Sequence, residues 1–353
     1  MNKRIVGLDI LKIIATIMII FHHYQQITGI WWGAASFYGG LFYYGELVEL
    51  FFMISGFIMY RYIEKIKAGL SLKKYCLQRF LRFIPVMSVC VIVTTIFAHI
   101  YIILYGEVFF NFDSFSLWTI FISSLGIQAG WFNTNLSINN PAWYVSVLLL
   151  CYIIMYMLVV LAEKIYVSYN YLFVVMIFLG LGIQYYGIDY PFFNYLSSRG
   201  YTTYFLGLLL AYNKNQSRRW INYPLCMLVI FTIPFLIYKQ YWLVLKDVKY
   251  IMIFIFYPAL ILIFSSQFIS KIFNWKWIGK LAGISYNAFM WHYPLIEIIY
   301  VFLKLFNIEI KLCTVNAMLV FLAICFIVGT LSHYLIEKPA NRVIDAKINE
   351  VMM

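Results

Sequence analysis

Residues 5–24 read IVGLDILKIIATIMIIFHHY, an apolar run long enough to cross a lipid bilayer, which takes about 20 residues. Hydrophobic residues make up 64% of the 353-residue chain and charged residues 11%, whereas soluble domains carry roughly 45–50% and about 25%. Lipid has to solvate such an excess of apolar surface, and apolar runs of this length are typical of helices. The sequence therefore predicts an all-α integral membrane protein.

Nine further apolar runs follow the first, and we expect about ten transmembrane helices in a single bundle. The ten runs lie at 5–24, 39–60, 80–105, 142–163, 170–187, 199–212, 221–238, 250–268, 281–303 and 313–335. The stretch 115–127 is too short to span and is expected to form an interfacial or re-entrant helix. No soluble domain or internal repeat interrupts the runs. One transmembrane domain is therefore predicted over 1–345, with a short cytoplasmic tail at 346–353.

The basic residues predict the orientation of this bundle. With a cytoplasmic N-terminus, 19 lysines and arginines fall on the inner side and six, among them Arg199, fall on the outer side. Cytoplasmic loops of membrane proteins carry such an excess, so the pattern favours ten spans with both termini cytoplasmic. We expect a multi-pass protein of the bacterial inner (plasma) membrane, in contact with membrane lipid. The net charge of +12 is then a topology signal and predicts no nucleic-acid partner.

The cysteines and the N-terminal residues predict neither a cysteine-based site nor a cleaved leader. The six cysteines form no Cys-x-x-Cys pair, so neither a disulfide framework nor a metal site is expected. The first apolar run contains Asp9 and Lys12 and ends at His22 and His23 rather than at small residues, so we expect no cleavable signal peptide.

Polar residues within the first run form a stripe on one helical face. Asp9 and Lys12 are three residues apart and are expected to neutralise each other. Thr16 and His23 fall on the same face, and His23 lies about 16 Å beyond Lys12 along the helix axis. Ionisable groups in a span are costly and are candidates for function. The alternative is a structural ion pair near the inner interface with an interfacial histidine at the outer end.

Two later stretches add charged candidates. Glu49 lies in the second run and needs a partner, for which an interior lysine or histidine is expected. Ser55 and Gly56 follow it, and small residues of this kind are typical of close helix packing. Arg79 and Arg82 lie on one helical face, where they either contact lipid headgroups or bind a cytoplasmic polyphosphate.

Three aromatic or imidazole side chains are candidate substrate contacts. Trp143 precedes Tyr144 at the start of the fourth run, where both also suit an aromatic belt at the outer interface. Tyr286 and His292 lie in the ninth run, and His292 is close to a proline at position 294.

The ordered set of these stretches resembles the membrane-bound acyltransferase family 3. The family pattern Asp-x-Leu-Arg/Lys, followed after ten residues by His, corresponds to Asp9–Lys12 and His23. Its Phe-Phe-x-x-Ser-Gly-Phe corresponds to Phe51–Phe57, with the acidic residue at Glu49. The motifs occur in the family's order over about residues 7–342.

The remaining motifs extend the resemblance to the end of the chain. Arg-x-x-Arg followed by proline corresponds to Arg79, Arg82 and Pro85. The C-terminal Ser-Tyr-x-x-Phe/Tyr-x-x-His and Ile-Glu-Lys-Pro motifs correspond to Ser285–His292 and Ile336–Pro339. Many members carry Trp-Ser-Leu-Ser-Val-Glu at the fourth span, whereas this chain has Leu148 in place of the glutamate.

The resemblance implies a ten-helix enzyme that moves an acyl group, most often acetyl, from cytoplasmic acetyl-CoA to a hydroxyl. The acceptor is commonly a cell-surface or lipid-linked glycan. It implies His23 as general base or transient acyl carrier, and Arg79 and Arg82 as the site for the CoA phosphates. Asp9, Lys12 and Glu49 are expected to balance charge and orient the base.

A transporter or flippase of a glycan precursor is the rival interpretation, because ten spans with a polar stripe also suit alternating access. The absence of a visible inverted repeat in the span pattern favours the enzyme.

Overall fold

The computed structural model describes residues 4–42, 44–109, 115–132, 138–216, 223–239 and 248–350. Within these residues the protein is helical, and a single isolated bridge between Tyr190 and Phe193 is the β-type pairing. The expectation of an all-α protein is confirmed. Six helices of the described part are long and apolar enough to cross a membrane. They are α1 (Val6–Thr28), α4 (Leu72–Tyr105), α6 (Ala142–Lys164), α7 (Tyr169–Tyr186), α13 (Lys276–Leu305) and the continuous helix that begins with α14 (Val315–Ser332).

The other four predicted runs also contain helices, but these are shorter, broken or more polar. α2 (Leu47–Met59) has 13 residues, and α8 (Tyr195–Gln216) has 22 residues with low mean hydropathy. The remaining two runs contain α9 (Tyr223–Tyr238) and, separated by a π turn at Met252–Phe256, α10 (Val248–Ile251) and α11 (Tyr257–Phe264). Length and composition therefore assign six spans, and the total of ten stays a prediction.

Short helices connect these elements. The stretch 115–127 contains α5 (Leu117–Leu125), so a helix forms where one was expected. α14 continues through a π turn at His333–Glu337 into α15 (Lys338–Glu350), so the predicted tail begins within a helix. The other short elements are η1 (Gly33–Ala35), η2 (Tyr44–Glu46), η3 (Tyr60–Tyr62), α3 (Ile63–Lys67) and α12 (Gln267–Ile272).

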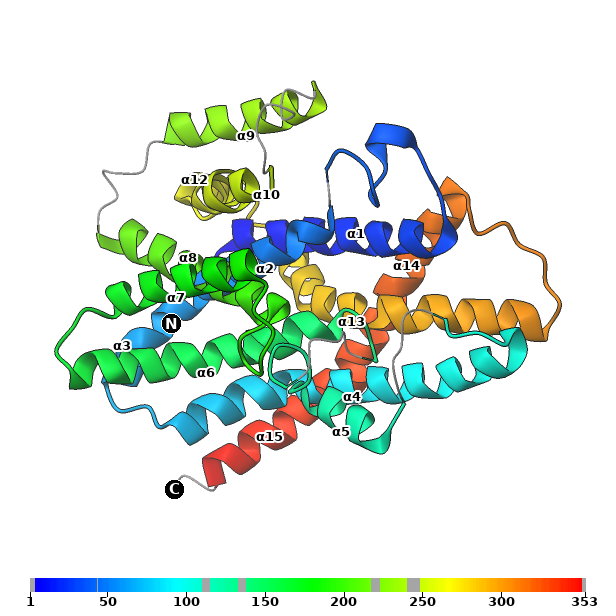
Figure 1. The fold of residues 1–353 in the computed structure, drawn as a ribbon, viewed down its shortest axis with the longest axis horizontal. Coiled ribbons are helices and arrows are strands. Elements are labelled where there is room, and N and C mark those ends of the chain that lie inside the picture. Colours follow the sequence, from blue (N-terminus) through cyan, green and yellow to red (C-terminus); the bar gives the residue numbers. More distant parts are fainter. Residues whose placement is uncertain are drawn as a thin grey trace.

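Most of the long helices run roughly along the long axis of the molecule, whereas the helix that begins with α14 crosses them at a steep angle (Figure 1). α13 occupies the centre and contacts α1, α4 and α14. The N-terminal end of α1, α3 and α15 lie towards the left in Figure 1, whereas the α1–α2 and α13–α14 connections lie towards the right. Ser71 caps the first turn of α4, where its hydroxyl accepts a hydrogen bond from the Lys74 backbone N–H.

α2 and α8 pack at backbone distance. A Cβ added to Gly56 would lie 2.0 Å from the Tyr204 carbonyl oxygen, and one added to Gly207 would lie 2.1 Å from the Met53 carbonyl oxygen. Glycine at both positions lets the two backbones touch, as in other membrane helix pairs. The prediction that Gly56 marks close helix packing is confirmed.

The two C-terminal motifs are joined by one hydrogen-bond network. Asn287 on α13 donates to Glu337 Oε2 at 2.5 Å and accepts from the Ser332 hydroxyl at 2.8 Å. Glu337 Oε2 also lies 2.7 Å from His333 Nδ1. These bonds hold the π turn at 333–337 against α13.

Candidate functional site

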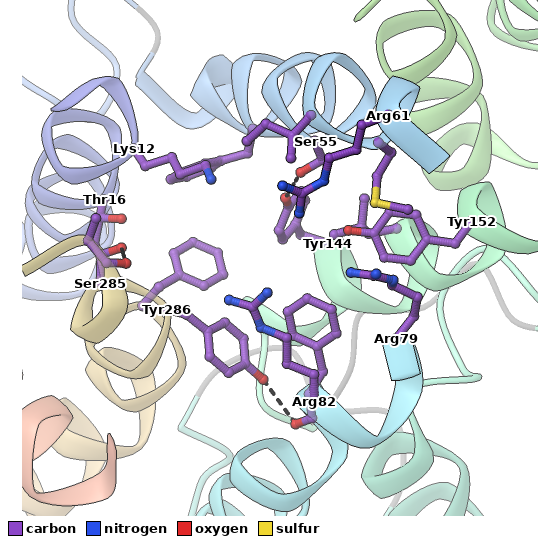
Figure 2. Close-up of a pocket in the computed structure, with 17 residues that line it drawn as sticks. Lys12, Thr16, Ser55, Arg61, Arg79, Arg82, Tyr144, Tyr152, Ser285 and Tyr286 are labelled. Carbon is purple, nitrogen blue, oxygen red and sulfur yellow. Dashed lines mark hydrogen bonds between the residues drawn. The ribbon is translucent and has the colours of Figure 1, made fainter. Parts of the chain in front are cut away.

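Four cationic side chains meet around a cavity between α1, α2, α4, α6 and α13. The charged ends of Lys12, Arg61, Arg79 and Arg82 converge on its centre in Figure 2. No aspartate or glutamate lines this cavity within the described part of the chain. The remaining lining residues, which together with the four cations define the basic cavity, are Thr16, Phe51, Ser55, Ile58, Met59, Phe83, Tyr144, Leu148, Tyr152, Ala282, Ser285, Tyr286 and Phe289.

The size of the basic cavity limits what it encloses. Its volume is about 160 Å³, close to the roughly 150 Å³ of an engineered cavity that binds benzene. A slender chain or one small group fits inside, whereas a nucleotide has to remain at the mouth. The cationic lining favours a negatively charged guest, since four like charges without a counter-ion repel one another.

Arg79 is the most buried of the four cations. Its side chain is 8% exposed, and its guanidinium lies 4.1 Å from the centre of the Tyr62 ring. Arg79 Nε is buried without a hydrogen-bond acceptor among the described residues. Burial works to raise the pKa of Tyr62, but Arg79, together with Arg61 and Lys65, outweighs it and holds that pKa below its ordinary value. The site is therefore strongly positive and keeps one donor free.

Lys12 faces the basic cavity without the ion partner expected from the sequence. Asp9 pairs with Arg4, which also donates to the Gly279 carbonyl oxygen at 2.8 Å. No carboxylate of the described residues forms an ion pair with Lys12 within 4 Å. The expected Asp9–Lys12 ion pair does not form, because Arg4, which lies two residues before the start of α1, binds the Asp9 carboxylate instead. Asp9 thus fixes the start of α1 against α13.

Hydroxyl groups complete the polar part of the lining. Tyr286 donates to the Phe83 carbonyl oxygen at 3.0 Å, which links α13 to α4. Ser55 Oγ lies 3.2 Å from Tyr144 Oη (Figure 2). Trp143, the predicted substrate contact, points elsewhere and packs against the Arg199 guanidinium at 4.7 Å. Its neighbour Tyr144 lines the cavity instead.

His23 and His292 form a histidine pair beyond the deep end of the cavity, away from its mouth. His23 Nδ1 lies 2.9 Å from His292 Nε2, and the two rings are nearly parallel, with centroids 5.0 Å apart and 14° between their planes. His292 is 1% exposed, whereas His23 is only partly buried. His292 Nδ1 lies 2.5 Å from the Phe289 carbonyl oxygen. The structure therefore brings together two histidines that are 269 residues apart in the sequence.

Three aromatic rings separate the basic cavity from the histidine pair. Phe289 lines the cavity, and its ring centroid is 5.7 Å from that of His292. Phe51 and Tyr144 pack against Phe289 with centroids 5.8 and 6.0 Å away. Thr16 is the last α1 residue that lines the cavity, so His23 lies about 10 Å further along the helix. We call these three rings the aromatic partition.

Residues 5–337 match the acyltransferase 3 family, which is described as an acyltransferase domain. The chain belongs to this family. The resemblance inferred from the sequence motifs is thereby confirmed, and the protein is an acyltransferase.

One curated relative of this acyltransferase is the peptidoglycan O-acetyltransferase OatA of Listeria monocytogenes. The two are 25% identical over an alignment that covers 97% of this chain and 56% of the relative. The chain thus spans about half the length of the curated relative that it matches. No solved structure matches the chain.

Glu49 lies outside the basic cavity in this acyltransferase. Its two carboxylate oxygens accept from Arg199 Nε and Nη2 at 2.6 and 2.8 Å. The partner is therefore an arginine of α8 rather than the lysine or histidine expected. Arg199 had been counted among the outer loop charges, but its side chain is 13% exposed and lies within the helix bundle.

Two residues near these sites were not identified from the sequence. Arg61 lies in η3, directly after α2, and lines the cavity. Glu297 on α13 is 0% exposed, and both of its carboxylate oxygens lack hydrogen-bond partners among the described residues. A carboxylate inside the run 281–303 carries the same signal as Glu49, so the sequence did contain a pointer to Glu297.

Metal-binding side chains do not gather anywhere in the described part of the chain. No group of three or more His, Cys, Asp or Glu residues there is placed to hold a metal ion. All six cysteines are free thiols.

Proposed function

We propose that this acyltransferase moves an acetyl group from cytoplasmic acetyl-CoA to a hydroxyl of a cell-surface or lipid-linked glycan. The observation that carries the proposal is the basic cavity, which has four cations and no carboxylate among its described lining residues. A donor with several phosphates suits that cavity, because arginine forks bind phosphate oxygens in pairs.

The orientation in the membrane follows from the same residues. In the proposed topology ten helices cross the cell membrane and both termini are cytoplasmic. Arg61, Arg79 and Arg82 follow α2 or begin α4, at the end of the bundle where α1 starts and α15 lies (Figure 1). With the buried Arg79 and Arg199 both left out, five outer basic residues remain against 18 inner ones. The stronger asymmetry supports a basic cavity that opens to the cytoplasm.

The donor would lie with its phosphates at the mouth of the basic cavity. Arg79 and Arg82 bind the phosphate-rich head, while Lys12 lies deeper on α1. Because the aromatic partition lies between the cavity and the histidine pair, its rings would have to turn aside for the pantetheine arm to reach His23, about 16 Å beyond Lys12 along α1. The cavity volume of about 160 Å³ suits the arm and excludes the nucleotide.

His23 would act as general base in the transfer. The acceptor hydroxyl loses its proton to His23 as its oxygen attacks the thioester carbonyl carbon. The new C–O ester bond forms, the C–S bond breaks, and the thiolate takes the proton from His23 to leave as CoA–SH. Imidazole titrates near neutral pH and is suited to accept and return one proton.

The other predicted site residues have supporting roles in this proposal. Asp9 holds Arg4 and Glu49 holds Arg199, so both carboxylates stabilise the helix arrangement around the cavity. Tyr286 fixes α13 to α4 beside the donor path. The acceptor class rests on the relative, whose name refers to peptidoglycan. A glycan acceptor approaches His23 from the side opposite the basic cavity.

The test uses purified protein in liposomes with acetyl-CoA labelled in the acetyl group. Label should move to a lipid-linked or soluble glycan acceptor when donor is supplied on the side where the termini are exposed. His23→Ala should abolish the transfer, and His99→Ala, an exposed residue of α4, should retain it. Transfer by His23→Ala at the wild-type rate, or glycan export without any acetyl transfer, would overturn the proposal.

A further inference from the structure

The hydrogen bonds around the histidine pair determine which nitrogens carry protons. A carbonyl oxygen accepts and never donates, so the bond to the Phe289 oxygen places a proton on His292 Nδ1. A neutral imidazole has one N–H, so His292 Nε2 is an acceptor. The 2.9 Å contact to His23 then requires His23 Nδ1 to donate. His23 Nε2 is left with a lone pair and without a proton.

We propose that His292 is a positioning residue that holds His23 in the tautomer protonated at Nδ1, with Nε2 free to accept a proton. Its catalytic consequence rests on the proposed function, because it matters only if His23 is the base. Both ring nitrogens of His292 are occupied by this role. His292 therefore has no ring nitrogen free for the substrate contact that the sequence suggested.

The backbone around Pro294 stabilises the arrangement. Proline has no N–H, so the Met290 carbonyl oxygen lacks its usual helical donor. Asn139 Nδ2 donates to that oxygen at 2.9 Å and is itself buried. The segment of α13 that carries Phe289 and His292 is thus tied to the start of α6. The His292 ring and the Phe289 carbonyl are therefore both held in place, which is required of a residue that orients a catalytic base.

Neutral surroundings favour a tautomer lock over a charge relay. No carboxylate of the described residues forms an ion pair with His23 or His292 within 4 Å. The nearest other imidazole is His22, whose ring is 5.2 Å from that of His23 and whose Nδ1 bonds to the Phe37 carbonyl oxygen. In the Ser-His-Asp proteases the orienting group is an aspartate, and a change that leaves histidine in the wrong tautomer costs about 10⁴-fold in rate.

Two amide variants of His292 separate this role from others. In His292→Gln the amide oxygen reaches the position of Nε2 and accepts from His23. In His292→Asn the shorter amide reaches the position of Nδ1, so the bond to Phe289 is kept but His23 loses its acceptor. Neither amide titrates, so a transfer step that needs an imidazole at 292 fails equally in both. His99→Gln serves as the matched control on α4.

The experiment records the ring nitrogens of ¹⁵N-histidine-labelled protein in nanodiscs by solid-state NMR, with acetyl transfer measured on the same samples. His23→Gln assigns the His23 signals. We expect the Nδ1-protonated form of His23 in the wild type and in His292→Gln, and its loss in His292→Asn. Transfer should fall about 100-fold or more in His292→Asn and be largely retained in His292→Gln.

Each departure from this pattern has its own meaning. A wild-type His23 protonated at Nε2 overturns the inference, as does a strong loss of transfer in His292→Gln with the tautomer unchanged. If the tautomer pattern is as expected but His23→Gln transfers normally, the positioning geometry stands and the proposed function fails. If His292→Asn does not fold, the wild type and His292→Gln still decide the tautomer.

Discussion

Glu49 on α2 and Arg199 on α8 form a bidentate ion pair in the helix bundle, although 150 residues separate them in the sequence. Glu49 is fully buried, and Trp143 covers the guanidinium with its ring. α2 itself has only 13 residues, so contacts with its neighbours are needed to hold it in place. The pair and the glycine contacts therefore fix α2, which carries Ser55 and leads to Arg61 at the basic cavity.

Breaking this pair should be more harmful than removing it. Glu49→Met or Arg199→Met alone leaves an uncompensated buried charge and should destabilise the protein by about 3–5 kcal/mol. The double variant should recover most of that loss, because well-packed apolar residues replace buried ion pairs at little cost. Thermal unfolding of purified protein in detergent gives the double-mutant cycle. Additive losses in the double variant would show that the two side chains act independently.

The same double variant tests whether Glu49 has a direct part in the transfer. If Glu49 is structural, the folded double variant should retain acetyl transfer.

The α2–α8 contact predicts a second stability effect. Gly207→Ala places a methyl group about 2.1 Å from the Met53 carbonyl oxygen, and a backbone atom has little room to move. We expect a loss of about 3 kcal/mol, at the upper end of ordinary overpacking. Gly182→Ala on α7 is the matched control, because nothing lies within 4 Å of the added Cβ. An equal thermal midpoint for both variants would contradict the proposed close packing.

The framework was predictable from the sequence to the extent that local rules fix it. Runs of apolar residues gave every long helix, since hydrocarbon leaves a lipid-exposed backbone few alternatives to helix. The π turn at 252–256 and the start of α2 at Leu47 were not predictable, because both depend on packing with other helices. The partner of Glu49 was missed for the same reason: Arg199 lies at the edge of a run and was read as a loop charge.

The basic cavity predicts how donor affinity should change. Arg79→Met removes a buried guanidinium whose Nε has no acceptor among the described residues. A hydrogen bond to a charged group contributes about 1.5–3 kcal/mol. The KM for acetyl-CoA should therefore rise about tenfold to 100-fold, with a smaller effect on kcat. Lys73→Met, an exposed residue of the same helix, is the control. The comparison uses initial rates at low ionic strength. An unchanged KM in Arg79→Met would place the CoA phosphates elsewhere.

Tyr62 should make donor binding sensitive to pH on the alkaline side. Arg79 and its cationic neighbours hold the Tyr62 pKa below its ordinary value, so the phenolate forms before pH 10. The new negative charge lies against Arg79 and lowers the positive potential, so binding of desulfo-CoA should weaken as the pH rises through that range. Tyr62→Phe should lack this component in equilibrium titrations. The same weakening in Tyr62→Phe would assign it to another group.

The site was predictable in part. Spacing predicted that Lys12 and His23 share one face of α1 and that Arg79 and Arg82 share one face of α4. The spacing within one helix does not reveal which side chains of different helices meet in a cavity. The contact of His23 with His292 joins α1 to α13 and has no local signature in the sequence. Asp9 was paired with Lys12 on spacing alone, whereas Arg4, just before the helix, is the partner. Trp143 and Tyr144 are adjacent, and only the packing of α6 determines that Tyr144 lines the cavity while Trp143 contacts Arg199.

The central claim is that His23 performs acetyl transfer to a glycan, and glycan mass spectrometry tests it most directly. Glycans are compared from cells that carry the wild type, His23→Ala at an equal membrane level, or no protein. The account predicts a mass increase of one acetyl group with the wild type and none in the other two. Equal acetylation with His23→Ala would contradict it.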